Sequence, residues 1–293
     1  MKSTVDCMPC FLRQALEAVR MTTDDPALHE ETIRRVLKMT AEMDLNVPPP
    51  VMGRRVHQLI RELTETPDPY QKIKRQYNQL ALQWFNELQL RVRMADDPFR
   101  AAVLLAIAGN IIDFGVDGAL CMQKVQDTID QALDQPLDRS TLERLGQEIH
   151  NARSILYLGD NAGEIVFDRL LLELMPLEKV VFVVKGSPII NDATMEDAVQ
   201  AGLTEIVRVI DNGSNAPGTV LEECSPVFRA AFESADLIIA KGQGNFETLN
   251  ETAANLFFLF QAKCPVVAGH IGKPVGTFVL RRSDCLERIV KTK

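Results

Sequence analysis

Four short segments in the second half of the chain carry residues that could do chemistry, and each one follows an apolar run. The segments are Gly159–Glu164, Lys185–Ser187, Asp211–Asn215 and Lys241–Asn245. Turns that serve only the fold need little more than glycine and asparagine. The presence of two lysines and two aspartates at these turns therefore indicates a site for an anion together with a cation.

Asp160 and Asn161 form the sharpest of these features. One interpretation is helix capping, with Asn161 as the N-cap and Glu164 three residues later in a capping box. Capping leaves Asp160 as an additional carboxylate at the end of a buried strand, where a lone charge is costly. A hard divalent cation would remove that cost, because it binds carboxylate and amide oxygens. These residues alone support capping and metal binding about equally.

Asp192 follows the second apolar run and precedes a helical stretch that begins at Thr194. Taken alone, Asp192 is most simply interpreted as a helix cap. If the first two strands are neighbours, however, Asp160, Asn161 and Asp192 could converge on one ion. Ligands that are all oxygen atoms favour magnesium, manganese or a similar hard ion over a thiolate zinc site.

The turn after the fourth apolar run has the composition of a phosphate cradle. Gly242 and Gly244 would let backbone N–H groups approach an anion at a helix N-terminus, with Asn245 in the same turn and Lys241 adding positive charge. Lys185 is a second candidate of this kind. Many such turns use glycine for geometry alone, and this one matches neither the P-loop nor the dinucleotide fingerprint.

The elements that must position these residues differ between the two halves of the chain. Up to about residue 150, apolar residues recur at three- and four-residue spacings, which predicts helices. The predicted helices are Phe11–Met21, Glu30–Met43, Val51–Thr64, Tyr70–Met94, Ala101–Ile112, Val125–Leu133 and Leu142–Ala152.

After residue 154, short β-rich runs alternate with helical stretches, which predicts βαβ units and a mainly parallel sheet. The predicted strands are Ile155–Leu158, Val180–Val184, Glu205–Ile210, Leu237–Ala240, Pro265–Ala268 and Phe278–Leu280. We therefore expect an α/β protein with an all-helical lobe over residues 1–150 and an α/β domain over residues 151–293. Ligands of such a sheet bind outside the carboxyl ends of its strands, where the four segments lie.

The composition limits the partners of this chain of 293 residues. A net charge of -8 disfavours nucleic acid and anionic membranes, because both require a basic surface, but not a small anionic substrate. No signal peptide or apolar segment long enough to span a bilayer is visible, and six cysteines do not form a disulfide framework. We expect a cytoplasmic protein, and the sequence leaves its oligomeric state open.

Two weaker features lie in the first half. Cys7 and Cys10 could be a redox pair, half of a metal site, or ordinary residues at a helix start. Asn110 and Asp113 are three residues apart and share one face of an otherwise apolar helix. That face could make a polar contact between the two lobes, or it could face the metal across a cleft.

Several of these segments together resemble a known family. Leu158–Glu164, Lys185–Asp192 and Lys241–Glu247 resemble the metal-dependent damage-control phosphatases, formerly a domain of unknown function, which include the acidic-residue-methyltransferase-like proteins. Asp6–Cys10, with its CxxC motif, and Gly109–Asp113 resemble the prokaryotic branch of this family. The resemblance extends over nearly the whole chain and keeps the order of the motifs.

The resemblance implies a Rossmann-like α/β/α domain joined to a helical lobe. It also implies a divalent metal ion held by Asp160, Asn161 and Asp192, and a contact between Lys241 and the substrate phosphate. Other branches carry an aspartate and an arginine in the last motif, which here reads Lys241–Glu247 with neither. The identity of the substrate therefore does not follow from the resemblance.

We thus expect a metal-dependent phosphatase that hydrolyses small phosphorylated metabolites, such as sugar phosphates or damaged phospho-metabolites, with Mn²⁺, Mg²⁺, Co²⁺ or Ni²⁺ as cofactor. An S-adenosylmethionine-dependent methyltransferase is the alternative enzyme. Against it, Gly159–Glu164 lacks a close series of glycines, and the second strand ends at Lys185, where a ribose would favour a carboxylate. A non-catalytic thiol or metal-binding module built on Cys7 and Cys10 is the third possibility.

Overall fold

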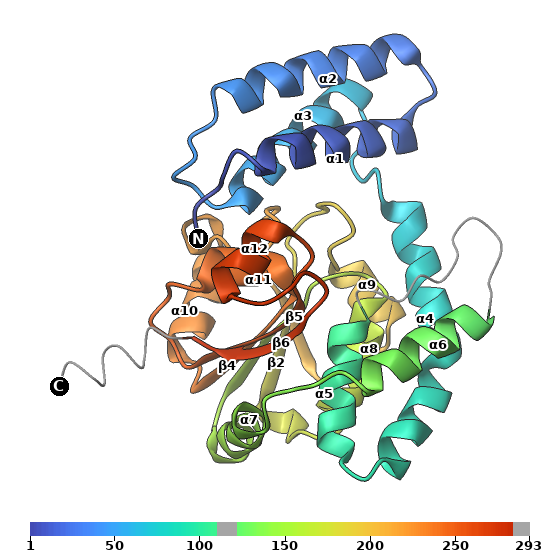
Figure 1. Ribbon diagram of the computed structural model, residues 1–293, viewed down its shortest axis with the longest axis vertical. Coiled ribbons are helices and arrows are strands. Elements are labelled where there is room, and N and C mark those ends of the chain that lie inside the picture. Colours follow the sequence, from blue (N-terminus) through green and yellow to red (C-terminus); the bar gives the residue numbers. More distant parts are fainter. Residues whose placement is uncertain (110–121, 284–293) are drawn as a thin grey trace.

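The computed structural model describes residues 1–109 and 122–283, and it begins with a series of helices (Figure 1). Apolar residues at helical spacing form these elements. One helix begins at Pro98, and the Asp97 side chain caps it by accepting a hydrogen bond from the Arg100 N–H. The helices before the sheet are α1 (Cys7–Thr22), α2 (Pro26–Ala41), α3 (Pro49–Thr64), α4 (Gln71–Met94), α5 (Pro98–Ala108), α6 (Met122–Leu133) and α7 (Arg139–Asn151).

A 6-stranded sheet follows, with the strand order β3-β2-β1-β4-β5-β6. Its strands are β1 (Ile155–Leu158), β2 (Val180–Val184), β3 (Arg208–Asp211), β4 (Leu237–Lys241), β5 (Leu256–Gln261) and β6 (Phe278–Arg282). Neighbouring strands from β3 to β5 pair in parallel, and β6 pairs antiparallel with β5. The prediction of an α/β fold with a mainly parallel sheet is confirmed.

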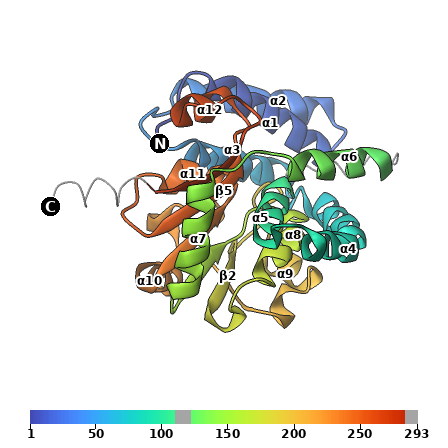
Figure 2. The ribbon, with the colours of Figure 1, turned by 60° about the horizontal axis from the view of Figure 1, so that its bottom comes forward.

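Helices cover both faces of this sheet (Figure 2). The connecting helices are α8 (Glu164–Leu172), α9 (Met195–Gln200), α10 (Pro226–Ser234), α11 (Gly242–Leu249) and α12 (Pro265–Ile271), with short 3-10 turns at Leu177–Lys179, Leu203–Glu205 and Leu221–Glu223. Tyr157 and Ile239 face a core that includes α4 to α9, whereas Leu158 and Ala240 face α10, α11 and α12. The result is the expected three-layer α/β/α arrangement.

Helices α1, α2 and α3 lie together at the top of Figure 1, and they have a hydrophobic core of their own. Ile190 and Val266 reach into it from the α/β part. Helices α4 to α7, by contrast, share the core of the sheet. The helices expected as one lobe over residues 1–150 therefore divide between two cores.

One predicted strand is wrong and one strand was missed. Pro265–Ala268 belongs to helix α12, because Pro265 occupies the first helical position after the N-cap Cys264. The fifth strand is instead Leu256–Gln261, an apolar run buried on both faces between β4 and β6. The predicted strand 205–210 corresponds to β3, which starts later, at Arg208.

Candidate active site

The candidate site lies where the strand order reverses, between β1 and β4. Parallel strands leave a ligand crevice at their carboxyl ends at such a switch point. Asp160 and Asn161 follow β1, Lys185 follows β2, and Lys241 ends β4. All four side chains are buried, so the sheet places charged groups below the surface at this edge.

The loops that follow β1 and β2 are joined by backbone hydrogen bonds. Ala162 N–H donates to Asn191 O over 2.9 Å, and Ala193 N–H donates to Asp160 O over 2.8 Å. These bonds form an isolated bridge between Asn161 and Asp192. The structure therefore brings Asp192 beside Asp160 and Asn161, as the sequence predicted for neighbouring strands.

Asn161 does not cap helix α8. The N-cap position is occupied by Gly163, and no side chain caps the helix. The Asn161 Nδ2 group instead donates to Asp160 Oδ2 over 2.7 Å and to Glu164 Oε2 over 3.1 Å. Because both amide hydrogens are directed at carboxylates, the Oδ1 atom of Asn161 is the atom left to bind a cation.

Asp192 is not a helix cap either. Helix α9 is capped by Thr194 and Asp197, which form a capping box. The Asp192 side chain is 4% exposed, and its Oδ1 atom lies 3.4 Å from Lys185 Nζ. Among the described residues this Oδ1 atom has no hydrogen-bond partner. A buried carboxylate oxygen left in this state is a suitable cation ligand.

The site holds more buried negative charge than positive charge. Burial, followed by repulsion from Glu164 and Asp192, raises the pKa of Asp160 well above its ordinary value. Burial also raises the pKa of Asp192, although Lys185 opposes the shift. A divalent cation would stabilise the ionised forms of both aspartates, which burial alone disfavours.

The donor set fits a hard divalent ion. Asp160, Asn161 and Asp192 offer two carboxylates and one amide oxygen, and Mg²⁺-like ions are held by one or two carboxylates while water and substrate complete the shell. Across residues 1–109 and 122–283, no group of three or more histidine, cysteine, aspartate or glutamate side chains could hold a metal. A site at the strand ends therefore depends on the amide of Asn161.

Lys241 has a different environment from the one predicted. Its Nζ atom donates to Ala106 O over 2.7 Å, to Glu164 Oε1 over 2.8 Å and to Asp168 Oδ1 over 2.5 Å. The side chain is 0% exposed. Burial lowers the pKa of Lys241, but Asp168 and Glu164 outweigh burial and raise it. Three protein acceptors thus use its three hydrogens, and its predicted contact with a substrate phosphate stays a prediction.

The glycine turn after β4 supports the site by close packing. Gly242 adopts a φ of +79°, and a Cβ atom there would lie 2.0 Å from Asp160 Oδ2. A Cβ atom at Gly218 would lie 2.2 Å from Gly244 O. The amide of Asn245 donates to Lys241 O over 2.8 Å and accepts from Thr219 Oγ1 over 2.7 Å. Asn245 therefore joins the two loops, and its predicted phosphate contact stays a prediction.

Lys185 is the lysine that lies beside the candidate ligands. Its Nζ atom hydrogen-bonds Gly218 O and pairs with Asp192 at 3.4 Å. Lys185 thus lies between two strand-end loops, as expected for a group that meets an anion bound at this edge.

A cavity of about 330 Å³ lies between α1, α3 and the first turns of α11 and α12. Its lining includes Cys7, Cys10, Gln243, Gly244, Lys263 and Cys264. The cysteines are free thiols, and burial raises the pKa of Cys10. The CxxC motif is thus at the border between the helical layer and the strand-end loops. Cys264, from the start of α12, faces the same cavity.

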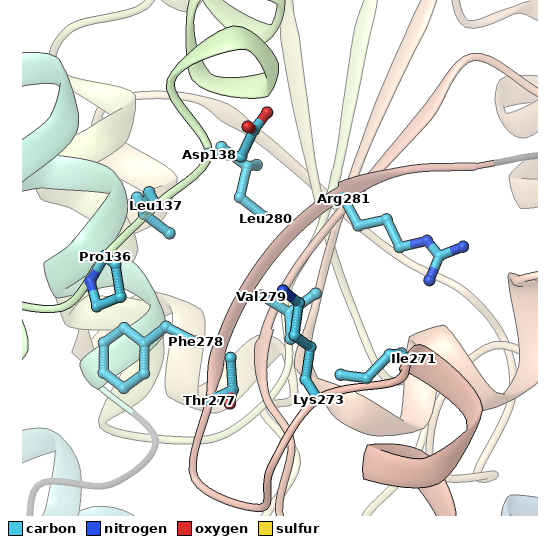
Figure 3. Close-up of a pocket in the computed structure, with 10 residues that line it drawn as sticks. All are labelled: Pro136, Leu137, Asp138, Ile271, Lys273, Thr277, Phe278, Val279, Leu280 and Arg281. Carbon is cyan, nitrogen blue, oxygen red and sulfur yellow. The ribbon is translucent and has the colours of Figure 1, made fainter.

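A second cavity, of about 410 Å³, lies between the start of α7 and strand β6 (Figure 3). Lys273 and Arg281 line it, but no predicted site residue does. Asn110 and Asp113, which could face the metal across a cleft or join the two lobes, lie outside the described residues.

The site contains two further carboxylates, Asp168, which the sequence analysis did not single out, and Glu164, which it placed only in a capping box. Glu164 and Asp168 lie four residues apart on α8, an otherwise mostly apolar and buried helix. Tyr157 OH donates to Asp168 Oδ1 over 2.8 Å, and burial raises the pKa of Asp168 to about 6. The signal in the sequence that could have identified them is the presence of two acidic residues, four apart, on the same face of an otherwise apolar helix.

None of the helices in residues 1–109 and 122–283 combines the length and the apolar character that crossing a membrane requires.

Comparison with known proteins places the chain among relatives of similar length. A family model described as the damage-control phosphatase ARMT1-like domain matches residues 3–279. An uncharacterized protein of Methanocaldococcus jannaschii is 40% identical over 290 residues, which cover 94% of this chain and 93% of that protein. A damage-control phosphatase of Archaeoglobus fulgidus is 35% identical, with 96% and 99% covered. A crystal structure of a DUF89 family protein from Pyrococcus horikoshii superposes with a TM-score of 0.88 at 35% identity, covering 97% and 99%.

Proposed function

This chain belongs to the damage-control phosphatase ARMT1-like family, and we propose that its strand-end site binds one divalent metal ion and hydrolyses phosphate monoesters of small metabolites. Relatives named as damage-control phosphatases support a phosphatase that acts on damaged metabolites. The metal-dependent chemistry rests on the geometry of the site.

One observation carries the proposal. Backbone hydrogen bonds join the β1 and β2 loops and place Asp160, Asn161 and Asp192 side by side. None of the three serves as a helix cap, and burial raises the pKa of both aspartates. An arrangement that is costly without a cation and rich in oxygen ligands suits a divalent ion.

The residues then have distinct tasks. Asp160, Asn161 and Asp192 would hold the ion, which when bound polarises the phosphoryl oxygens and lowers the pKa of water. Lys185, which already lies 3.4 Å from Asp192, would offset negative charge on the phosphoryl group. Gly242 leaves room for the Asp160 carboxylate.

The organic part of the substrate would occupy the cavity of about 330 Å³ beside the glycine turn. Gln243 and Gly244 line it and directly follow Gly242. The lining also includes Arg13, Gln14 and Lys263, together with the carboxylates of Asp6 and Glu247. Polar and cationic groups of this kind suit a hydrophilic phosphorylated metabolite such as a sugar phosphate.

The two alternative functions have no specific observation in their favour. The strand β2 still leads into Lys185 at the place where a ribose-binding carboxylate would stand. Family membership favours phosphate hydrolysis over methyl transfer and over a thiol-binding module.

The test is a phosphate-release screen across sugar phosphates and nucleotides, with protein that has been treated with chelator and then supplied with Mg²⁺, Mn²⁺, Co²⁺ or Ni²⁺. We expect release from at least one ester only with an added ion, and loss of release in Asp160→Asn. The matched control is Asp211→Asn, a strand-end aspartate that is exposed and accepts the Gly213 N–H. Undiminished release in excess chelator, or no release with any ester and ion, would contradict the proposal.

A further inference from the structure

A series of buried hydrogen bonds connects two residues of helix α8 with the end of β4 and with Asn161. Asp168 Oδ1 accepts from Lys241 Nζ over 2.5 Å, and Glu164 Oε1 accepts from the same atom over 2.8 Å. The other oxygen of Glu164, Oε2, accepts from Asn161 Nδ2 over 3.1 Å. All four side chains are at most 8% exposed. Water therefore cannot replace a partner that is removed without a rearrangement.

This series of hydrogen bonds determines the orientation of the Asn161 amide. Glu164 uses one oxygen for Lys241 and the other for Asn161. Rotation of the amide by a half-turn would place Asn161 Oδ1 against the Asp160 and Glu164 carboxylates, so that three acceptors would face one another. Glu164 therefore keeps Nδ2 inward and leaves Oδ1 for the cation.

Lys241 in turn fixes the position of Glu164, because its other two hydrogen bonds hold the ammonium group in place. Its third acceptor, Ala106 O at 2.7 Å, belongs to helix α5. The lysine thus ties β4, α5 and α8 together, and its 0% exposure leaves no surface that a phosphate could touch.

We infer that Glu164 and Lys241 are positioning residues that present the amide oxygen of Asn161 to the metal ion, and that Lys241 does not bind the substrate phosphate. This inference rests on the proposed metal site and adds a role for two residues that neither the motif nor the relatives' names assign. Substitution of a residue that orients a metal ligand typically lowers metal affinity or activity about 10–100-fold.

Glu164→Gln is the first test, because the side chain keeps its size but has one acceptor where Glu164 has two. A glutamine can accept from Lys241 or from Asn161, but its own NH2 group then faces the other donor. With Mn²⁺ as the probe in calorimetric titration, we expect the dissociation constant to rise about tenfold or more. The KM of a phosphate ester at saturating Mn²⁺ should change less than about threefold, because the groups proposed to bind the ester are not altered.

Tyr157→Phe is the matched control. It removes a buried hydrogen bond to Asp168, the member of the series farthest from Asn161, and leaves Glu164 and Asn161 paired. We expect a lower unfolding temperature but an unchanged Mn²⁺ dissociation constant. A general loss of stability is thereby separated from a loss of ligand orientation.

The double variant Lys241→Met with Asp168→Asn covers the case in which a single change does not fold, because it removes one buried charge of each sign. We expect weaker Mn²⁺ binding and a nearly unchanged KM. Unaltered Mn²⁺ affinity in this variant and in Glu164→Gln would overturn the inference, as would a large rise in KM with Mn²⁺ affinity retained. The wild-type arm decides the proposed function separately, since it shows whether Mn²⁺ binds and supports phosphate release at all.

Discussion

Gly242 lies so close to Asp160 that a Cβ atom at position 242 would be 2.0 Å from Asp160 Oδ2. The two residues belong to the turns after β4 and β1, which are neighbours in the sheet. The backbone of one turn therefore forms the wall behind the carboxylate of the other. The shape of the candidate metal site depends on the absence of a side chain at Gly242.

Gly242→Ala should consequently damage both stability and function. The φ of +79° alone costs an alanine about 1 kcal/mol or more, and the new methyl group must displace the Asp160 carboxylate. We expect weaker Mn²⁺ binding and strongly reduced phosphate release, measured by calorimetry and a phosphate assay. Gly269→Ala in α12 is the control, because a Cβ atom there meets nothing within 4 Å. If Gly242→Ala binds Mn²⁺ normally, the packing of this turn does not shape the site.

Lys185→Met should affect the phosphate and not the metal. The variant removes the partner that lies 3.4 Å from Asp192, so Mn²⁺ affinity should be retained or increased. Loss of a charged contact worth about 1.5–3 kcal/mol should raise KM or lower kcat by roughly tenfold to a hundredfold. Lys273→Met, at the second cavity (Figure 3), is the control for loss of a positive charge. Steady-state kinetics at saturating Mn²⁺ measure this effect. Unchanged KM and kcat in Lys185→Met would show that Lys185 does not contact the phosphate.

Glu247→Gln should change the pH dependence of stability. Burial raises the pKa of Glu247 to about 7 from 4.5, although its hydrogen bond with Gln243 opposes the shift. The folded protein therefore binds a proton more tightly than the unfolded chain. The ionisation cost is absent below pH 4.5, grows from there to pH 7 and is then constant, at up to about 3 kcal/mol.

Denaturant unfolding at pH 5 and pH 8 measures this effect. The variant should resemble the wild type at pH 5 and gain stability relative to it at pH 8. The exposed change Glu251→Gln controls for the loss of one negative charge. A difference between variant and wild type that is the same at both pH values would show that the buried carboxyl does not titrate as described.

Asn78→Ala should loosen the loop that carries Asn161. Asn78 Oδ1 accepts from Gly163 N–H over 2.6 Å, and its Nδ2 group donates to Asp197 and to Gln200, each over 3.0 Å. The loss of these buried bonds should lower the free energy of unfolding by about 2–4 kcal/mol. Gln79→Ala, a change at an exposed position of the same helix, should stay within about 0.5 kcal/mol of the wild type. Equal stability of the two variants in urea would refute this role for Asn78.

The sequence was informative where a pattern is local. Short buried runs bounded by turn residues correctly predicted β1, β2 and β4, and these strands placed Asp160 and Asp192 at one edge. A short apolar run can form a strand or a helix, so Pro265–Ala268 was predicted as a strand although Pro265 suits the first position of helix α12. The strand Leu256–Gln261 was missed for the same reason.

The contacts of single side chains could not be read in this way. A lysine in a glycine turn suggests a phosphate ligand, but Lys241 points at Glu164 and Asp168 on α8. That direction depends on how α8 packs against β4, which no local pattern reveals. The roles of Cys7 and Cys10 stay open for a similar reason, since their cavity is formed by elements far apart in sequence.

Calorimetric titration of metal-free protein with Mn²⁺, in the wild type and in Asp192→Asn, tests the central claim most directly. Asparagine keeps the shape of Asp192 but removes a buried negative charge, and Thr194 and Asp197 continue to cap α9. We predict one Mn²⁺ bound per wild-type chain, and a folded variant whose affinity for Mn²⁺ is lower by orders of magnitude. Equal Mn²⁺ affinity in the two proteins, or no binding by the wild type, would contradict a metal site built from Asp160, Asn161 and Asp192.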